Sequence, residues 1–297
     1  MLDYRIETFI TLCKERNYSK TAQILCITQP AVTQHIQYLE RYYNCKLFEY
    51  ENKQLNLTSQ GKILERMALG LSASTKRVQL LIQESKNKAK AFKVGGSLSV
   101  SEYMIPPVLT ELLKLTPNLN VDFIVDSSIN LIKGLKTGAT ECIIIEGEFD
   151  KQELEYRLFS TEEYIAISSK PVDATSLNEV LNETLICANQ DSGCYKLLTK
   201  ELLKEGLTIN DFCNVVYTNN LTLIKKLVKT GVGIAFIYKN AVLNELENGE
   251  LFEIPLQKAI YQDYHFVTLK NNMFLKDYLN FYEFAKSIYH KQELSNI

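Results

Sequence analysis

Polar side chains that can hydrogen-bond to DNA bases gather in one short stretch near the N-terminus. Thr28, Gln29, Thr33 and Gln34 lie where a helix is expected to begin, with Pro30 in its first turn. A glutamine amide can pair with both major-groove groups of adenine, and a threonine can contact a thymine methyl group or a phosphate. The chemistry available to this stretch is recognition of a base edge in the major groove.

Apolar residues at helical spacing predict three short helices around these side chains. Ser19 is the expected N-cap of the second helix and Thr28 that of the third. The residues spaced for buried faces are Ile6, Phe9, Ile10 and Cys13, then Ala22, Leu25 and Cys26, then Val32, Ile36, Leu39 and Tyr43. This pattern is typical of a helix-turn-helix that inserts its second element into the groove. A helical hairpin with a polar outer face is the alternative.

The continuation favours DNA binding. Leu55 and Leu57 alternate ahead of Thr58, which predicts a small hairpin with Asn52-Lys53 at its tip. The run SKTAQILCITQPAVTQHIQYLE from Ser19, followed by Leu47-Phe48 and by LTSQG from Leu57, resembles LysR-type transcriptional regulators. The resemblance implies a winged helix-turn-helix over residues 1–58. Its candidate DNA-binding residues are Ser19, Thr28, Gln29, Pro30, Thr33, Gln34 and Lys53.

Three positions depart from the family pattern. Asn44 stands where glycine is usual, but asparagine tolerates the left-handed conformation that a turn requires. Thr21 replaces a usual alanine. Tyr50 occupies a wing position that is commonly arginine, which leaves one phosphate or minor-groove contact unaccounted for.

A long helix is predicted over residues 59–90, capped near Thr58 or Ser59. About 30 residues would form a rod of roughly 45 Å. Spacings of three and four, typical of a seam between two helices, connect Leu64, Met67, Leu71, Ser74, Val78 and Leu81. A buried helix within one chain is the alternative, but the flanking lysines and arginines are too polar for burial all round. The resemblance implies that this linker pairs two subunits, giving a homodimer and a homotetramer built from two dimers.

From Gly95 onward, short apolar strands alternate with helices, which predicts parallel α/β sheets. The expected strands are Leu98 and Val100, then 121–125, 142–145, 185–187, 214–217, 234–237 and the neighbourhood of Val267. Helices are expected after Pro106-Pro107, 128–130, Ser176 with Glu179 as its capping box, Ser192 and Thr222, with a final one over 274–294.

The resemblance implies that residues 91–297 form an effector-binding domain of two lobes, of the type 2 periplasmic-binding-protein kind. The first lobe would run from Gly95 to Thr161 and resume near His265, and the second would fill the middle. The fold class is therefore α/β, with an N-terminal winged helix-turn-helix and a linker helix. A ligand would bind between the lobes, where strand ends and helix N-termini meet.

The candidate effector-binding residues are Ser101, Glu102, Tyr103, Ser127, Ser128, Ser192, Gly193, Thr218 and Asn219. Helix capping is the alternative for each, because serine, threonine and asparagine cap helices in most proteins. We expect a small polar metabolite. Where many relatives have Thr-Arg, this chain has Cys194-Tyr195, which argues against a strongly anionic ligand.

Enzymatic interpretations are disfavoured. Gly231-Val232-Gly233 ends a helix rather than opening one, and three histidines offer no catalytic grouping. No cofactor or metal is predicted, because the seven cysteines lack metal-ligand spacing. A redox role for Cys194 is a more specific alternative, since a helix N-terminus can lower the pKa of a thiol. The alternative function for the whole chain is thus that of a ligand-binding or redox-signalling protein with a vestigial helix-turn-helix.

Composition agrees with a DNA-binding domain on an acidic body. The formal net charge is −2, yet residues 1–93 hold 15 basic and 8 acidic side chains, against 18 and 27 in the rest. With 46% hydrophobic residues, no signal segment and no membrane-length apolar run, the chain is expected to be globular and cytoplasmic, without a membrane partner. The expected partners are double-stranded operator DNA, the metabolite and RNA polymerase.

Overall fold

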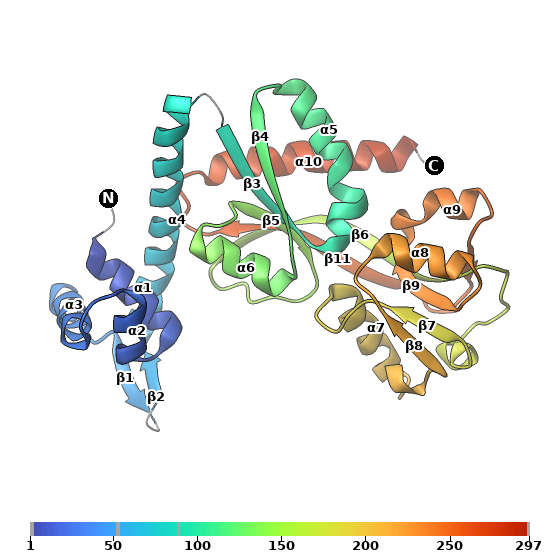
Figure 1. The fold of residues 1–297 in the computed structure, drawn as a ribbon, viewed down its shortest axis with the longest axis horizontal. Coiled ribbons are helices and arrows are strands. Elements are labelled where there is room, and N and C mark those ends of the chain that lie inside the picture. The colour runs from blue at the N-terminus through green and yellow to red at the C-terminus, as the bar shows by residue number, and fades with distance from the viewer. Residues whose placement is uncertain (1–2, 52–53, 88–89, 296–297) are drawn as a thin grey trace.

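The computed structural model describes residues 3–51, 54–87 and 90–295. A small helical domain with a two-stranded hairpin lies at one end of a long helix, and a two-lobed α/β body lies on the other side of that helix (Figure 1). The predicted order of parts, from helix-turn-helix through linker helix to α/β body, is confirmed.

The small domain contains the three expected helices and the wing. Their bounds are α1 (Tyr4–Glu15), α2 (Tyr18–Ile24), α3 (Gln29–Tyr42), β1 (Phe48–Glu51) and β2 (Gln54–Leu57). Phe9, Leu12, Ile36 and Leu47 are fully or almost fully buried and form its core. Thr28 caps α3, because its Oγ1 accepts a hydrogen bond from the Ala31 N–H at 3.3 Å. The predicted left-handed turn at Asn44 is confirmed by its φ of 51°.

Three local expectations in this domain are wrong. Asn17, not Ser19, caps α2, since the Asn17 Oδ1 accepts a hydrogen bond from the Lys20 N–H at 2.9 Å. Cys26 is exposed because α2 has already ended, and its backbone is left-handed with a φ of 53°. Tyr43 is exposed because it follows the last turn of α3.

Helix α4 (Ser59–Asn87) begins in close contact with the wing. The Thr58 Oγ1 accepts a hydrogen bond from the Gly61 N–H at 2.9 Å and donates one to the Lys46 carbonyl at 2.7 Å. A Cβ at Gly61 would lie 2.2 Å from the Leu47 carbonyl oxygen, so glycine is required there. The start of the linker helix is therefore held in direct contact with the DNA-binding domain.

The predicted seam on α4 is correct only in part. Met67, Leu71 and Val78 are exposed, as a seam requires, but Leu64 packs against the core of the small domain. Ser74 is buried against the loop before the last helix, where the Met273 N–H donates to its Oγ at 3.5 Å. The side chain of Leu81 lies outside the described set. The exposed apolar residues define the α4 stripe, which consists of Ile63, Met67, Leu71, Val78 and Ile82.

The first lobe holds one edge of the large sheet. Its elements are β3 (Lys90–Gly96), the π-helix η1 (Val100–Met104), α5 (Ile105–Leu115), β4 (Leu119–Val125), α6 (Ser128–Thr137) and β5 (Cys142–Glu146). Strand β3 is parallel to both β4 and β5. Helix α4 packs against α6, where the Lys76 Nζ donates a hydrogen bond to the Thr137 carbonyl.

The second lobe holds the other edge. Its elements are η2 (Leu177–Val180), β7 (Thr184–Cys187), α7 (Gly193–Lys204), η3 (Ile209–Asp211), β8 (Asn214–Tyr217), α8 (Leu221–Lys229), β9 (Ile234–Tyr238), η4 (Lys239–Ala241), α9 (Leu243–Glu247) and β10 (Phe252–Ile254). Strand β7 is parallel to β8 and β9. The helix predicted after Ser176 is only a 3-10 turn, and Glu179 accepts from the Thr175 N–H rather than from that of Ser176.

Two long antiparallel strands, β6 (Leu154–Ser168) and β11 (Ile260–Leu269), join the lobes before the final helix α10 (Leu275–Ser295). The sheet order is β4-β3-β5-β11-β6-β9-β7-β8, and β10 pairs with β6. Strand β5 pairs with β11 at Tyr264 to Val267, whereas β9 pairs with β6 at Tyr164 to Ile167. The change of lobe therefore falls near the expected boundary, where the register also shifts between Tyr264 and His265.

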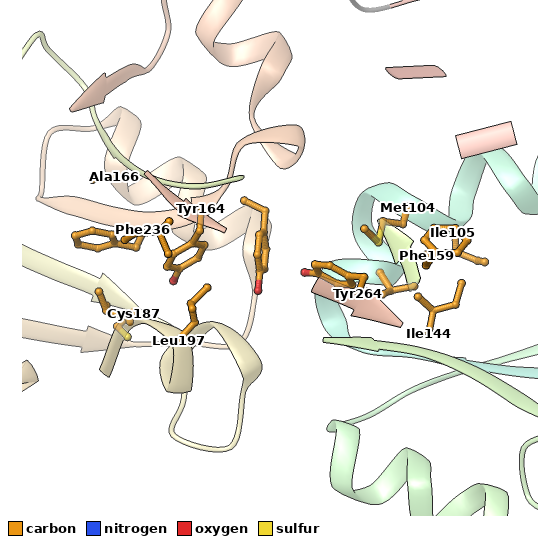
Figure 2. Close-up of a cluster of buried hydrophobic side chains, with 14 of the residues drawn as sticks. Met104, Ile105, Ile144, Phe159, Tyr164, Ala166, Cys187, Leu197, Phe236 and Tyr264 are labelled. Atoms are coloured by element: carbon orange, nitrogen blue, oxygen red, sulfur yellow. The ribbon is translucent and has the colours of Figure 1, made fainter. Parts of the chain in front are cut away.

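The largest buried cluster extends through both lobes. Figure 2 shows Met104, Ile144 and Phe159 on one side and Tyr164 and Phe236 on the other, with the Tyr264 ring pointing toward the second group. Continuous burial of this kind is a dominant source of stability, at about 25 cal/mol per Å² of apolar surface. It also places aromatic rings directly behind the junction of the lobes.

Candidate nucleic-acid interface and ligand cleft

The polar turn of α3 is presented to solvent. Gln29, Pro30 and Gln34 are exposed and Thr33 is half-buried. The Thr33 Oγ1 donates to the Gln29 carbonyl at 3.2 Å and accepts from the Gln29 Nε2 at 3.4 Å, so the first turn holds both side chains on one face. Helix α3 lies on the outer side of the small domain, away from the α/β body (Figure 1). This placement leaves the start of α3 free to enter a major groove.

The remaining DNA-binding candidates are less directly supported. Ser19 is exposed in the first turn of α2, and Thr28 is engaged in capping α3. Lys53 lies outside the described residues. Arg5, Lys20 and Lys46 are paired with Asp3, Glu15 and Glu40, at 2.9, 2.6 and 2.8 Å. Part of the excess positive charge of the N-terminal region is therefore neutralised by ion pairs within the DNA-binding domain.

A cavity of about 360 Å³ lies between the two lobes. The first lobe contributes the ends of β3, β4 and β5, and the second contributes the start of α7, the region around α8 and the end of β9. The lining residues are Ser97, Leu98, Ser99, Tyr103, Val125, Asp126, Ser127, Ser128, Asn130, Glu146, Ala188, Asp191, Ser192, Gly193, Cys194, Asn219, Leu221, Ile224, Phe236, Ile237, Tyr238 and Ala241.

Six of the nine sequence-predicted effector residues line this cavity: Tyr103, Ser127, Ser128, Ser192, Gly193 and Asn219. Two of them also cap helices, as the alternative interpretation held. The Ser127 Oγ accepts from the Asn130 N–H at 3.4 Å, and the Ser192 Oγ accepts from the Tyr195 N–H at 3.1 Å.

Ser101, Glu102 and Thr218 do not line the cavity, so these three expectations are corrected. The Ser101 Oγ donates to the Leu98 carbonyl at 2.6 Å within a helical turn, and Glu102 is exposed. The Thr218 Oγ1 accepts from the Asn220 N–H at 3.2 Å. For Ser101, the reason is that β3 already ends at Gly96, so the strand predicted at Leu98 and Val100 is absent.

Ser97 and Ser99 take the place expected of Ser101. Both are buried at the cavity wall, with their hydroxyl oxygens 3.2 Å apart. The Tyr264 hydroxyl donates to the Ser99 Oγ at 2.8 Å, which ties this wall to β11. The alternation of serines at 97, 99 and 101 was visible in the sequence. Only the end of the strand decides which of them face the cleft.

Glu146 is another lining residue that was not predicted from the sequence. It is the last residue of β5 and is 5% exposed, and its carboxylate accepts a hydrogen bond from the Ser97 Oγ. Burial raises the pKa of its carboxyl group. The signal in the sequence was an acidic residue directly after the apolar run Cys142 to Ile145.

Cys194 does not have the lowered pKa that a redox role requires. Burial raises the pKa of its thiol, and the neighbouring Glu146 charge adds to the increase. The expected effect of the α7 N-terminus is therefore outweighed by burial. All seven cysteines are free thiols. The pKa of the Cys194 thiol therefore gives no support to the redox alternative.

Both parts of the chain match models of one family. Residues 4–62 match the model described as "Bacterial regulatory helix-turn-helix protein, lysR family", and residues 85–287 match "LysR substrate binding domain". The chain belongs to the LysR family. It is a transcriptional regulator with a substrate-binding domain, and its matched relatives are regulators rather than enzymes.

Relatives of this LysR regulator match over most of their length. It is 25% identical over 252 residues to "HTH-type transcriptional regulator CysL" of Bacillus subtilis, covering 83% of each chain. It is 23% identical to CitR of the same organism, covering 94% of this chain and 98% of CitR. A solved Corynebacterium glutamicum OxyR mutant with hydrogen peroxide bound shares the fold, with a TM-score of 0.61, 16% identity and coverage of 97% and 92%. Within its described residues, this regulator has no helix both long and apolar enough to cross a membrane.

Proposed function

We propose that this LysR-type regulator binds operator DNA through the first turn of α3 and the β1–β2 wing, and that a small polar metabolite in the inter-lobe cavity changes the bound state. The division into residues 1–58, 59–90 and 91–297 is part of this proposal. The observation that carries it is the cavity itself, which both lobes line with helix N-termini and hydroxyl groups. A ligand bound there would contact both lobes and so could alter their relative arrangement.

The proposal includes a homodimer paired through the α4 stripe. Five large apolar side chains of one helix face solvent in the single chain, which is typical of a surface that another chain covers. Two copies of α3 would then meet two half-sites of a partly palindromic operator. We further propose pairing of dimers into a tetramer, contact with RNA polymerase and a cytoplasmic location.

Gln29→Ala should weaken operator binding by about 1–3 kcal/mol while leaving most non-specific binding intact, because a base-specific amide contact is lost. Thr33→Ala should have an effect of the same kind. Footprinting and fluorescence anisotropy on operator and scrambled duplexes would measure both. Gln152→Ala, which removes the same amide from an exposed turn of the α/β body, is the control. An unchanged operator footprint for Gln29→Ala would refute the assignment of α3 as the recognition helix.

A further inference from the structure

The inter-lobe cavity is acidic. Asp126, Glu146 and Asp191 line it, and its lining in the described chain includes no lysine, arginine or histidine. Lys196 on α7 lies close enough for its charge to act on Glu146, but its side chain is exposed and no ion pair joins the two. The ionisable side chains around the Glu146 carboxylate are otherwise Cys194 and the tyrosines Tyr238 and Tyr264. An anion entering this cavity would therefore find no countercharge.

The helix N-terminus best placed to attract an anion is already filled by the protein. A Cβ at Gly193, the first residue of α7, would lie 2.3 Å from the Glu146 Oε1, so the carboxylate is packed directly against this helix end. Glu146 comes from the first lobe and α7 from the second. The protein's own carboxylate thus lies beside the α7 N-terminus, close to where an external anion would approach the helix.

A second carboxylate, that of Asp126, lies next to the start of α6. The Asp126 Oδ1 accepts from the Ser127 N–H at 2.7 Å and from the Asn130 Nδ2 at 2.9 Å. These hydrogen bonds, that of Asn130 first, lower the pKa of the Asp126 carboxyl and keep it ionised. An anionic ligand group would therefore meet carboxylates that already line the cavity.

The rest of the lining suits a cation with an apolar body. Leu98, Val125, Ile224 and Phe236 provide apolar surface, and the rings of Tyr103 and Tyr238 can interact with a positive charge through their faces. The Tyr238 hydroxyl is buried, with 1% of the residue exposed, and has no hydrogen bond of ordinary geometry within the described residues. Its interactions with Tyr264 and Cys194 are its only polar contacts among the described residues, so a polar ligand group could improve its hydrogen bonding.

Building on the proposed cleft function, we infer that the cavity takes a ligand with a cationic head group, a primary ammonium or a guanidinium, on a short apolar body. The head group would pair with Glu146, and the body would lie against the aromatic and aliphatic lining. An ammonium donates up to three hydrogen bonds, which matches a carboxylate beside two serine hydroxyls. Pairing would also relieve the cost of a buried charge that no basic residue neutralises.

The ligand-free protein provides the first test. Because Glu146 serves the ligand rather than the fold, Glu146→Gln should raise Tm by roughly 2 °C or more near pH 7. The carboxyl pKa is raised in the folded state, so the wild type loses stability as pH rises from the ordinary value of 4.5 through the raised value. The gain from the substitution should therefore vanish at pH 4.5 and below. A lower Tm for Glu146→Gln at pH 7 would overturn the inference, and Glu102→Gln, an exposed glutamate outside the cavity, is the control.

The second test measures the charge preference with three probes of one shape: 3-phenylpropylammonium, 3-phenylpropionate and 3-phenylpropan-1-ol. Calorimetry on the full chain should show that the ammonium binds about ten-fold or more tightly than the propionate. Glu146→Gln should lose about ten-fold for the ammonium and leave the alcohol within about two-fold.

Three outcomes would overturn the charge preference: tighter binding of the propionate, equal ammonium binding by Glu146→Gln, or no ammonium binding at roughly 10 mM probe. Binding of the propionate or the alcohol that is blocked by Val125→Trp, at the cavity mouth, would leave the cavity as a ligand site. In that case the class of ligand is wrong, but the proposed function stands.

Discussion

Replacing Leu71 and Val78 together by aspartate is expected to convert the regulator to a monomer and to lower its operator affinity by about 100-fold or more. Leu71 is 56% and Val78 37% exposed in the single chain, so both aspartates remain in water as long as the chain is alone. In the dimer they would be buried without partners, which costs about 3–5 kcal/mol for a buried charge. Each half-site would then be held by one chain only.

Light scattering and fluorescence anisotropy on a full operator would measure assembly and affinity for this double variant. Gln79→Asp is the matched control, because it places the same poor helix former on an exposed position of α4 outside the α4 stripe. A dimer that survives the double substitution would show that α4 does not form the subunit interface.

Val125→Trp should abolish the response to a metabolite and spare basal operator binding. Val125 is 47% exposed at the end of β4 and lines the mouth of the cavity, so the larger ring can be accommodated without disturbing the core. An indole there would occupy part of the 360 Å³ that a ligand needs. Since an effector shifts an equilibrium only by its differential affinity for two states, loss of binding removes the shift entirely.

The measurement is an operator footprint with and without a metabolite selected by thermal shift on the full chain. Ile129→Trp adds the same ring to an exposed position of α6 that does not line the cavity, and should keep the response. A full response in Val125→Trp would place the effector elsewhere on the molecule.

Features set by local chemistry were predictable from the sequence. The cap at Thr28 and the start of a helix near Ser192 were predicted because a cap is a hydrogen bond between a side chain and a backbone N–H about three residues away. The winged helix-turn-helix was found because its residues match a family pattern at fixed spacing. Local propensity failed at Val100, whose alternation with Leu98 suggests a strand although the residue opens a π-helix and is buried in the core.

Features set by distant partners were not predictable. Ser74 is buried by a loop about 200 residues away in the chain, so no periodicity on α4 could distinguish it from the exposed stripe. The charge of the cavity depends in the same way on Glu146, which meets Ser97 across 49 residues and Gly193 across the lobes. Cys194-Tyr195 argued against a strongly anionic ligand, but only the assembled cleft shows the Asp126 and Glu146 carboxylates beside the starts of α6 and α7.

During synthesis on the ribosome, the DNA-binding domain is complete long before the sensor exists. Its core closes with residues up to Ala68, whereas the first lobe needs β11, which lies between β5 and β6 in the sheet. At 5–20 residues per second, the interval from Ala68 to Leu269 lasts roughly 10–40 s. A product that ends before β11 would retain the polar turn of α3 but neither a finished sheet nor a ligand cavity. Such a fragment would compete with the full chain for operator half-sites. No effector would regulate it, because it lacks the ligand cavity.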